Sequence, residues 1–154
     1  DFCLSRGLGD VYKRQTVTDD RLAESGLAEP VIRHGRLDAQ RDFIDVRDVA
    51  AAYAAAMTLA AERTETYNVG SGEPVTVERI LRILVGLARI TVRSELDPDR
   101  VRAGDPGTLA LDASRFRLRT GWTPTIPLER SLEDTLDHWR SVIARSPANA
   151  PIVA

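Results

Sequence analysis

Two arginines and an aspartate stand out as residues that could bind an anionic ligand. Arg41 precedes a short apolar stretch, and Arg102 and Asp105 share a loop rich in proline, glycine and charge. A planar guanidinium can hold two oxygens of a diphosphate, so two arginines from separate segments could form a clamp. A nearby carboxylate could accept both hydroxyls of a ribose. Spacing alone favours a solvated or Asp-paired Arg41, and leaves a solvated loop equally open for Arg102 and Asp105.

Other polar segments have simpler structural explanations. The acidic cluster at 42–48 could suggest a metal or acid/base site, but Asp45 suits a helix cap and Asp48 the first turn of that helix. The segment Gly70-Ser71-Gly72 links an expected strand to a helix. It lacks the lysine of a P-loop and the spacing of a dinucleotide fingerprint, which favours a tight turn. The two histidines have no partners at metal-ligand spacing.

Short extended segments are expected at residues 31–34, 42–44, 66–69 and 91–96. The first two flank a polar turn and are expected to pair with each other. The third is followed by the glycine turn and an amphipathic helix, and this order is typical of α/β folds. The long loop at 97–107 is typical of a functional segment.

Helical patterns account for most of the remaining chain. They are expected at residues 16–27, 45–60, after residue 72, from 112 or 114 to 120, and from 128 to 146. Gly121 should end the fourth helix, and Trp122 should anchor a core. In the second helix apolar residues recur at helical spacing, and the many alanines between them predict close packing against another surface. The recurring residues are Val46, Val49, Tyr53, Met57 and Ala60.

Composition excludes several classes of protein. The chain has 154 residues, 43% of them apolar and 29% charged, which is typical of a globular domain rather than a disordered segment. The net charge is -2 and the charges are interspersed, which argues against a nucleic-acid partner. No long apolar run predicts a membrane helix and no leader is apparent, so a cytoplasmic location is expected.

Residues 1–15 differ from the rest of the sequence. They contain the only cysteine, Cys3, and the only lysine, Lys13, whereas all later basic residues are arginine. This segment resembles a translated sequencing-adapter tail, and we expect it to be a non-native or disordered segment. The expected domain therefore covers residues 16–146, with a flexible tail at 147–154.

Several motifs together resemble one enzyme family. They are the segments 41–48 (RDFIDVRD), 67–73 (YNVGSGE) and 102–105 (RAGD), the Gly121-Trp122 pair and the final amphipathic helix. They are similar to the C-terminal part of extended short-chain dehydrogenases/reductases, the NAD-dependent epimerase/dehydratase family. The resemblance is strongest to the branch of GDP-mannose 4,6-dehydratase and GDP-6-deoxy-mannose reductase, because residues 35–42 (GRLDAQRD) are similar to a segment of that branch.

The resemblance implies an α/β fold, with a C-terminal substrate-binding lobe plus an edge strand and helices of a Rossmann-type domain whose N-terminal core is missing. It implies that Arg41 and Arg102 contact the diphosphate of a nucleotide sugar, preferably a GDP-hexose, and that Asp105 contacts the ribose. The missing half would bind NADP or NAD, and the parent enzyme would be a homo-oligomer. This chain has neither the glycine-rich cofactor turn nor the Tyr-x-x-x-Lys pair, so we expect it to lack catalytic residues.

The sequence departs from the motifs of this family at two positions, and two other identities of the chain stay open. Ala103 replaces the usual proline of the loop motif, and Arg36 replaces the usual asparagine of the GDP-type segment. A fragment of a UDP- or dTDP-sugar epimerase or dehydratase is one alternative. A non-catalytic α/β binding module, supported by the absent catalytic motifs, is the other.

Overall fold

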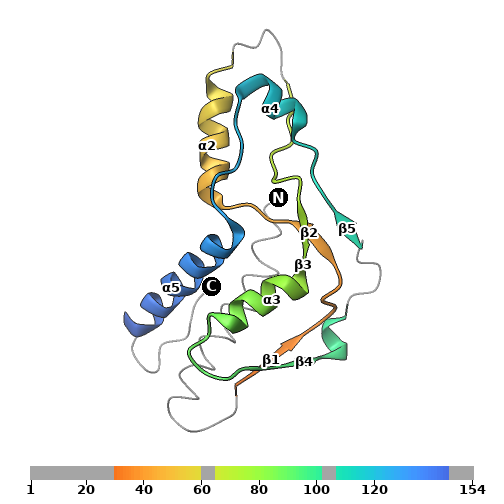
Figure 1. Ribbon diagram of the computed structural model, residues 1–154, viewed down its shortest axis with the longest axis vertical. Coiled ribbons are helices and arrows are strands. Elements are labelled where there is room, and N and C mark those ends of the chain that lie inside the picture. The colour runs from red at the N-terminus through yellow and green to blue at the C-terminus, as the bar shows by residue number, and fades with distance from the viewer. Residues whose placement is uncertain (1–29, 60–64, 102–106, 146–154) are drawn as a thin grey trace. The chain divides into compact units, whose positions relative to one another are not determined.

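The structure of the protein, a computed structural model, describes residues 30–59, 65–101 and 107–145 (Figure 1). The chain divides into two compact units. One consists of Asp1–Leu37, Leu81–Ala103 and Leu132–Ala154, and the other of Asp38–Ile80 and Gly104–Ser131. The helix expected at 16–27, the segment 1–15 and the tail 147–154 lie outside the described residues. Within the described part of the chain, no helix combines the length and apolarity needed to cross a bilayer.

The first unit contains a pair of parallel strands. β1 (Val31–His34) lies beside β4 (Arg93–Leu96), and Ile32 at the centre of β1 is fully buried. The 3-10 helix η1 (Pro98–Arg100) follows β4. A Cβ at Gly35 would lie 2.4 Å from the carbonyl oxygen of Arg100. Glycine therefore permits the close approach of the two segments that leave β1 and β4.

The predicted pairing of 31–34 with 42–44 is wrong. The second strand, β2, is Gln40–Asp42, and it pairs with other strands, whereas β1 pairs with β4. The next residues, Phe43 and Ile44, are unpaired in the sheet because they lead into the cap of the following helix, and Ile44 packs on a hydrophobic cluster. A turn between two adjacent extended segments was a misleading signal here, because nonlocal parallel pairing leaves no local pattern.

Two helices begin in the second unit and continue into the first. They are α3 (Val77–Gly86) and α5 (Leu128–Arg145), which confirm the expected amphipathic helices. In the first unit, Leu136 of α5 is buried against Leu87 and Trp139. The Nη2 atom of Arg140 donates to the carbonyl oxygen of Leu87 at 2.8 Å, which satisfies an acceptor at the end of α3.

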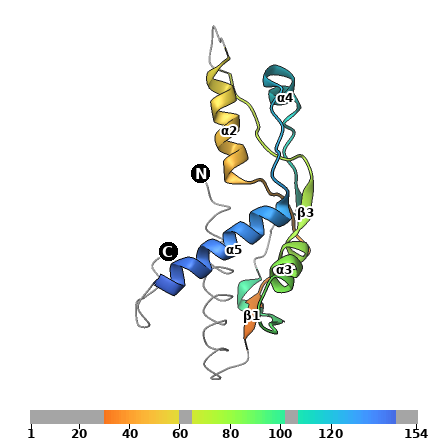
Figure 2. The same ribbon diagram turned by 60° about the vertical axis from the view of Figure 1, so that its left-hand side comes forward.

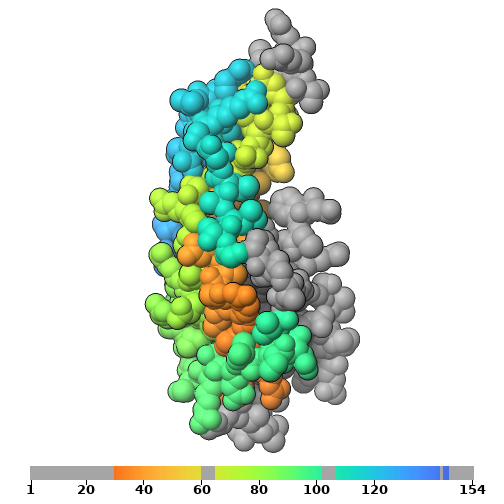
Figure 3. All heavy atoms as spheres, turned by 90° about the vertical axis from the view of Figure 1, so that its right-hand side faces the viewer, coloured from red at the N-terminus to blue at the C-terminus, as the bar shows by residue number. Residues whose placement is uncertain are grey.

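The second unit contains a small mixed sheet with β2 at its centre. β2 pairs antiparallel with β3 (Pro74–Thr76) and parallel with β5 (Thr108–Leu109). Figure 3 shows the orange residues of the β2 region beside the teal residues of β5 on one face of the protein. Residues from three distant parts of the sequence therefore meet at β2.

The core of the second unit is formed by residues of α2 (Val46–Met57) and α4 (Ser114–Thr120), and α4 lies near the upper part of α2 in Figures 1 and 2. Ala52, Phe116 and Trp122 are buried together, and the rings of Phe116 and Trp122 lie 5.6 Å apart. Gly121 ends α4 with a left-handed backbone, φ 69°. The expected helix stop and the expected role of Trp122 are both confirmed.

The close packing that the alanines of α2 predict is confirmed, whereas three of its larger apolar residues are exposed. Val46, Tyr53 and Met57 are 69%, 61% and 87% exposed, while Ala52 is 1% exposed. The aromatic rings of the core pack against the alanine side of α2, because only small side chains allow rings to approach the helix so closely. Ala60 lies outside the described residues.

Residues 66–69, which were predicted to form a strand, do not form one in the structure. A strand requires a neighbour to complete its ladder, and this segment has none among the described residues. Instead Tyr67 and Val69 pack on the cluster around Phe116, and the Tyr67 and Phe116 rings lie 5.5 Å apart.

Candidate functional site

Arg41 lies in the central strand of the small sheet. It is opposite Val75 of β3 and Leu109 of β5. Its side chain is half-buried, and Nη1 donates to the carbonyl oxygen of Gln40 at 2.7 Å. Because successive side chains of a strand point to opposite faces, Arg41 faces away from Gln40 and Asp42. The sheet fixes the backbone of Arg41. A binding side chain is held more precisely on a strand or helix than on a loop.

The loop with Arg102 and Asp105 lies outside the described residues, so the placement of these two residues stays a prediction. The residue that ends this loop, Gly107, is described. Its carbonyl oxygen accepts a hydrogen bond from the backbone N–H of Gln40 at 2.7 Å. The end of the loop is thus joined to the residue that precedes Arg41.

The neighbouring residue, Asp42, holds several backbone segments together. Its Oδ1 accepts hydrogen bonds from the backbone N–H of Ser71 at 2.9 Å and from the Ser71 hydroxyl at 2.5 Å. Its Oδ2 accepts from the backbone N–H of Gly72 at 2.8 Å and of Leu111 at 3.2 Å. Nothing in the sequence pattern indicated this role, because all its donors are distant in sequence.

The segment Gly70-Ser71-Gly72 is a tight turn, as predicted. Gly72 has a positive φ of 76°, and a Cβ at Gly70 would lie 2.8 Å from Oδ2 of Asp42. From the other side, Nη2 of Arg117 donates to the carbonyl oxygens of Gly70 and Ser71, at 3.2 and 2.6 Å. The N–H groups of Ser71 and Gly72 that could bind a phosphate already bind the Asp42 carboxylate.

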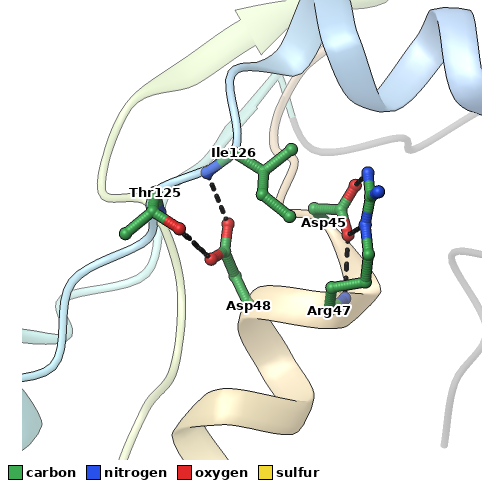
Figure 4. Close-up of polar contacts among 5 residues, drawn as sticks. All are labelled: Asp45, Arg47, Asp48, Thr125 and Ile126. Carbon is green, nitrogen blue, oxygen red and sulfur yellow. Dashed lines mark hydrogen bonds and ion pairs between the residues drawn. The ribbon is translucent and has the colours of Figure 1, made fainter.

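Asp45 caps α2, as predicted. Its side chain accepts a hydrogen bond from the backbone N–H of Arg47 at 2.8 Å (Figure 4). The Arg47 guanidinium also donates to both carboxylate oxygens, from Nε at 2.9 Å and from Nη2 at 2.8 Å. These bonds with Arg47 hold the pKa of Asp45 well below its ordinary value, against the opposing effect of burial. The group is therefore a stable anion and a poor candidate for acid/base catalysis.

Asp48 has a larger structural role than the predicted first-turn interaction with the helix dipole. It is buried, and its carboxylate accepts hydrogen bonds from the backbone N–H and the hydroxyl of Thr125, both at 3.0 Å, and from the backbone N–H of Ile126 at 3.0 Å (Figure 4). Its backbone carbonyl oxygen accepts from Nε1 of Trp122 at 3.1 Å. Asp48 thus fixes the loop between α4 and α5.

A cavity of about 490 Å³ lies in the second unit, and Arg41 is not among the residues that line it. Its charged lining residues are largely paired within the protein: Arg79 with Glu129 at 2.8 Å, and Asp45 with Arg47. Both side chains of the Arg79–Glu129 pair are half exposed. Because Arg41 does not line this cavity, we place the candidate site at β2 rather than in the cavity.

The histidines have ordinary surroundings. Nδ1 of His34 lies 2.8 Å from the carbonyl oxygen of Gly35, and the rings of His138 and Trp139 are nearly perpendicular, with centroids 5.6 Å apart. Among the described residues, no three His, Cys, Asp or Glu side chains gather in a way that could hold a metal ion.

Comparison with known proteins places the chain in a family. The family model described as GDP-mannose 4,6 dehydratase matches residues 14–135, a range that includes β2, the glycine turn and the loop at 102–106. The chain belongs to the GDP-mannose 4,6 dehydratase family. The predicted membership in the extended short-chain dehydrogenases/reductases and the predicted Rossmann-type α/β class are thereby confirmed.

Individual relatives differ in activity. GDP-6-deoxy-D-mannose reductase of Pseudomonas aeruginosa is 30% identical over 118 residues, which are 77% of this chain and 38% of the reductase. UDP-glucose 4-epimerase of Neisseria meningitidis serogroup B is 33% identical over 104 residues, 66% of this chain and 29% of the epimerase. Members of this group of relatives therefore reduce or epimerise different nucleotide sugars.

The structure resembles that of RMD from Pseudomonas aeruginosa complexed with NADPH. The TM-score is 0.73 at 27% sequence identity, and the match covers 86% of this chain and 43% of the solved chain. The protein thus spans less than half the length of the relatives that it matches.

Proposed function

We propose that this chain is the nucleotide-sugar-binding part of an NAD(P)-dependent enzyme, with GDP-mannose 4,6-dehydratase or GDP-4-keto-6-deoxy-mannose reductase as the parent activity. Arg41 and Arg102 hold the diphosphate, and Asp105 accepts the ribose hydroxyls. The parent enzyme acts in the cytoplasm as a homo-oligomer. Nucleic acids and membranes are not its partners.

One observation carries this proposal. The hydrogen bond from the N–H of Gln40 to the carbonyl oxygen of Gly107, followed by the parallel pairing of β2 with β5, joins the strand of Arg41 to the end of the loop with Arg102 and Asp105. Two arginines on segments joined in this way can converge on one diphosphate, which presents several anionic oxygens to bidentate donors.

The preference for GDP has two supports. The segment 35–42 is similar to that of the GDP-mannose branch, and the reductase of Pseudomonas aeruginosa, named for a GDP-linked sugar, is 30% identical. Arg36 is exposed and stands at the position where that branch has asparagine, so it is the residue whose substitution should alter base preference first.

The described glycine turn does not fit a dinucleotide cofactor. A phosphate at this turn would need the N–H groups of Ser71 and Gly72, which the Asp42 carboxylate occupies, and the two anions would repel each other. We assign the binding of NADP or NAD to a part of the enzyme outside this chain. The sequence has no Tyr-x-x-x-Lys pair, and we expect the chain to bind substrate without converting it.

A second candidate is a fragment of a UDP-sugar epimerase. The UDP-glucose 4-epimerase of Neisseria meningitidis, 33% identical over its shorter match, favours this alternative. A diphosphate clamp would be common to both enzymes, so the base of the bound nucleotide distinguishes them.

Calorimetric titration of the 154-residue chain with GDP, UDP and dTDP tests the proposal. We expect GDP to bind most tightly, and Arg41→Gln to weaken its binding by about tenfold or more, as expected for loss of hydrogen bonds to a charged group. Arg89→Gln, which removes the same charge from an exposed position of the first unit, is the control and should leave binding unchanged. Tighter binding of UDP would favour the epimerase, and equal binding by wild type and Arg41→Gln would exclude the clamp.

A further inference from the structure

The outward face of α2 is apolar along the whole helix. Its side chains recur at helical spacing and none of them is charged; they are Val46, Ala50, Tyr53, Ala54 and Met57. All five residues are exposed, and Met57 is 87% exposed. The surface face of a helix in a globular domain is usually polar, so an apolar face of this length is typical of a surface that packs against another part of a protein.

The opposite side of α2 already packs on the core of the second unit. Ala52 is buried with Phe116 and Trp122, and the carboxylate of Asp48 accepts hydrogen bonds from the loop between α4 and α5. The helix therefore cannot turn its larger apolar side chains inward without losing these contacts. The exposed face is a fixed feature of the described unit, so its partner has to approach from outside.

A second feature of the same unit also lacks a partner. Residues 66–69 are extended, with Tyr67 and Val69 packed on the aromatic cluster and Thr66 and Asn68 exposed. This alternation is that of a strand. Among the described residues, however, none forms a backbone-to-backbone hydrogen bond with 66–69. Because the backbone groups of a packed extended segment are normally paired, a neighbouring strand would complete this one.

The comparisons indicate what could supply both partners. This chain covers 38% of the GDP-6-deoxy-D-mannose reductase and 43% of the solved RMD chain, both of Pseudomonas aeruginosa. More than half of each relative therefore has no counterpart here. A second copy of this chain would cover α2 only by packing one 12-residue helix against itself, a contact smaller than stable interfaces usually bury.

We propose that the apolar face of α2 and the extended segment 66–69 form the surface on which the part of the parent enzyme outside this chain packs. That part presents an apolar face to Tyr53 and Met57, and a strand edge to residues 66–69. The alanines of α2 then contact the aromatic core, and its larger side chains contact the rest of the enzyme. The inference rests on the proposed function only in that this chain is part of a larger enzyme, and it requires no nucleotide.

The test compares this chain alone with the chain joined to the rest of a relative. In the joined protein, the 154-residue chain replaces the 118 matched residues of the Pseudomonas aeruginosa reductase. Tyr53→Ser shortens the central large side chain of the apolar face. Leu118→Ser is the matched control, because Leu118 is 87% exposed, as Met57 is, but belongs to α4. Met57 is the only methionine of the chain, and its rate of oxidation by peroxide, read by mass spectrometry, reports whether the face is covered.

We expect Tyr53→Ser to lower the melting temperature of the joined protein by at least about 2 °C and to leave that of the chain alone within about 1 °C. Leu118→Ser should leave both melting temperatures unchanged. Oxidation of Met57 should be at least about tenfold slower in the joined protein than in the chain alone, and faster again in its Tyr53→Ser variant. In the chain alone, the oxidation rate should not depend on protein concentration, because no second copy covers the face.

Equal oxidation rates in the chain alone and in a folded joined protein would overturn the inference, as would equal effects of Tyr53→Ser and Leu118→Ser on the joined protein. A rate in the chain alone that falls as its concentration rises would overturn it in favour of a second copy. If the joined protein does not fold, the two parts are co-expressed as separate chains, and failure of this chain to capture the reductase part overturns the inference.

The same joined protein separates this inference from the proposed function. Binding of GDP by a joined protein with an unprotected Met57 would refute the inference alone. Protection of Met57 in a joined protein that binds no GDP, UDP or dTDP would support the inference and refute the proposed function.

Discussion

Asp48 and Thr125 are joined by two hydrogen bonds, both 3.0 Å long, from the backbone N–H and the hydroxyl of Thr125 to one carboxylate oxygen. Asp48 is 3% exposed. Removing a buried acceptor leaves its donors unsatisfied, so Asp48→Ala should lower the free energy of unfolding by about 3 kcal/mol. Urea denaturation, monitored by circular dichroism, measures this change in the free energy of unfolding. Asp99→Asn, at an exposed position of η1, should change stability by less than about 0.5 kcal/mol; similar losses in both variants would contradict the assigned role of Asp48.

The aromatic core of the second unit predicts a contrast within one helix. Phe116 is 1% exposed and Leu118 is 87% exposed, although both belong to α4. Phe116→Ala should cost about 3 to 5 kcal/mol because it leaves a cavity beside Trp122 and Ala52. Leu118→Ala should stay within about 0.5 kcal/mol of wild type. Equal effects in thermal unfolding would mean that α4 packs through another face.

The cap of α2 predicts a pH-dependent contribution to stability. The pKa of Asp45 is lowered in the folded state, mainly by the hydrogen bond from Arg47, so its contribution is fully present above the unfolded pKa near 4 and is lost as the pH falls toward the lowered folded value. Asn also caps helices well, so Asp45→Asn mainly removes the charge. We expect a loss of about 1 kcal/mol at pH 7 that shrinks steadily below about pH 4, measured by urea denaturation across pH. A difference independent of pH would exclude the charge as its source.

Two glycines with different surroundings should respond oppositely to alanine. A Cβ at Gly70 would lie 2.8 Å from the Asp42 carboxylate, whereas a Cβ at Gly86, the last residue of α3, would meet nothing within 4 Å. Gly70→Ala should destabilise the protein by about 1 to 3 kcal/mol through overpacking. Gly86→Ala should be neutral or stabilise it by up to about 1 kcal/mol. Thermal unfolding of the two variants measures both effects. An unchanged melting temperature in Gly70→Ala would mean that the turn is looser than described.

Local signals in the sequence predicted the elements better than their partners. The cap at Asp45, the stop at Gly121 and the anchor at Trp122 depend on residue type and nearby spacing, and all three are confirmed. The strand that pairs with β1 depends on distant residues, and the predicted pairing of 31–34 with 42–44 was wrong. The alanines of α2 predicted close packing correctly, but nothing local indicated that Val46, Tyr53 and Met57 would be exposed.

In the candidate site, too, local features were predicted and features that depend on distant residues were not. The motif around Arg41 was recognisable, and its location in a short strand segment next to a polar turn was close to the structure. The roles of Asp42 and Arg117 were not predicted, because their partners at the glycine turn follow or precede them by many residues. The binding roles of Arg102 and Asp105 are implied by the family resemblance alone, and they stay predictions.

The central claim is that the chain recognises a diphosphate through Arg41. The most direct measurement compares the affinities of guanosine, GMP and GDP for wild type and Arg41→Gln by calorimetry. We predict that GDP binds wild type at least about tenfold more tightly than GMP, and that Arg41→Gln removes most of this difference. Equal affinities of GMP and GDP for the wild-type chain, or a difference that persists in Arg41→Gln, would contradict the account.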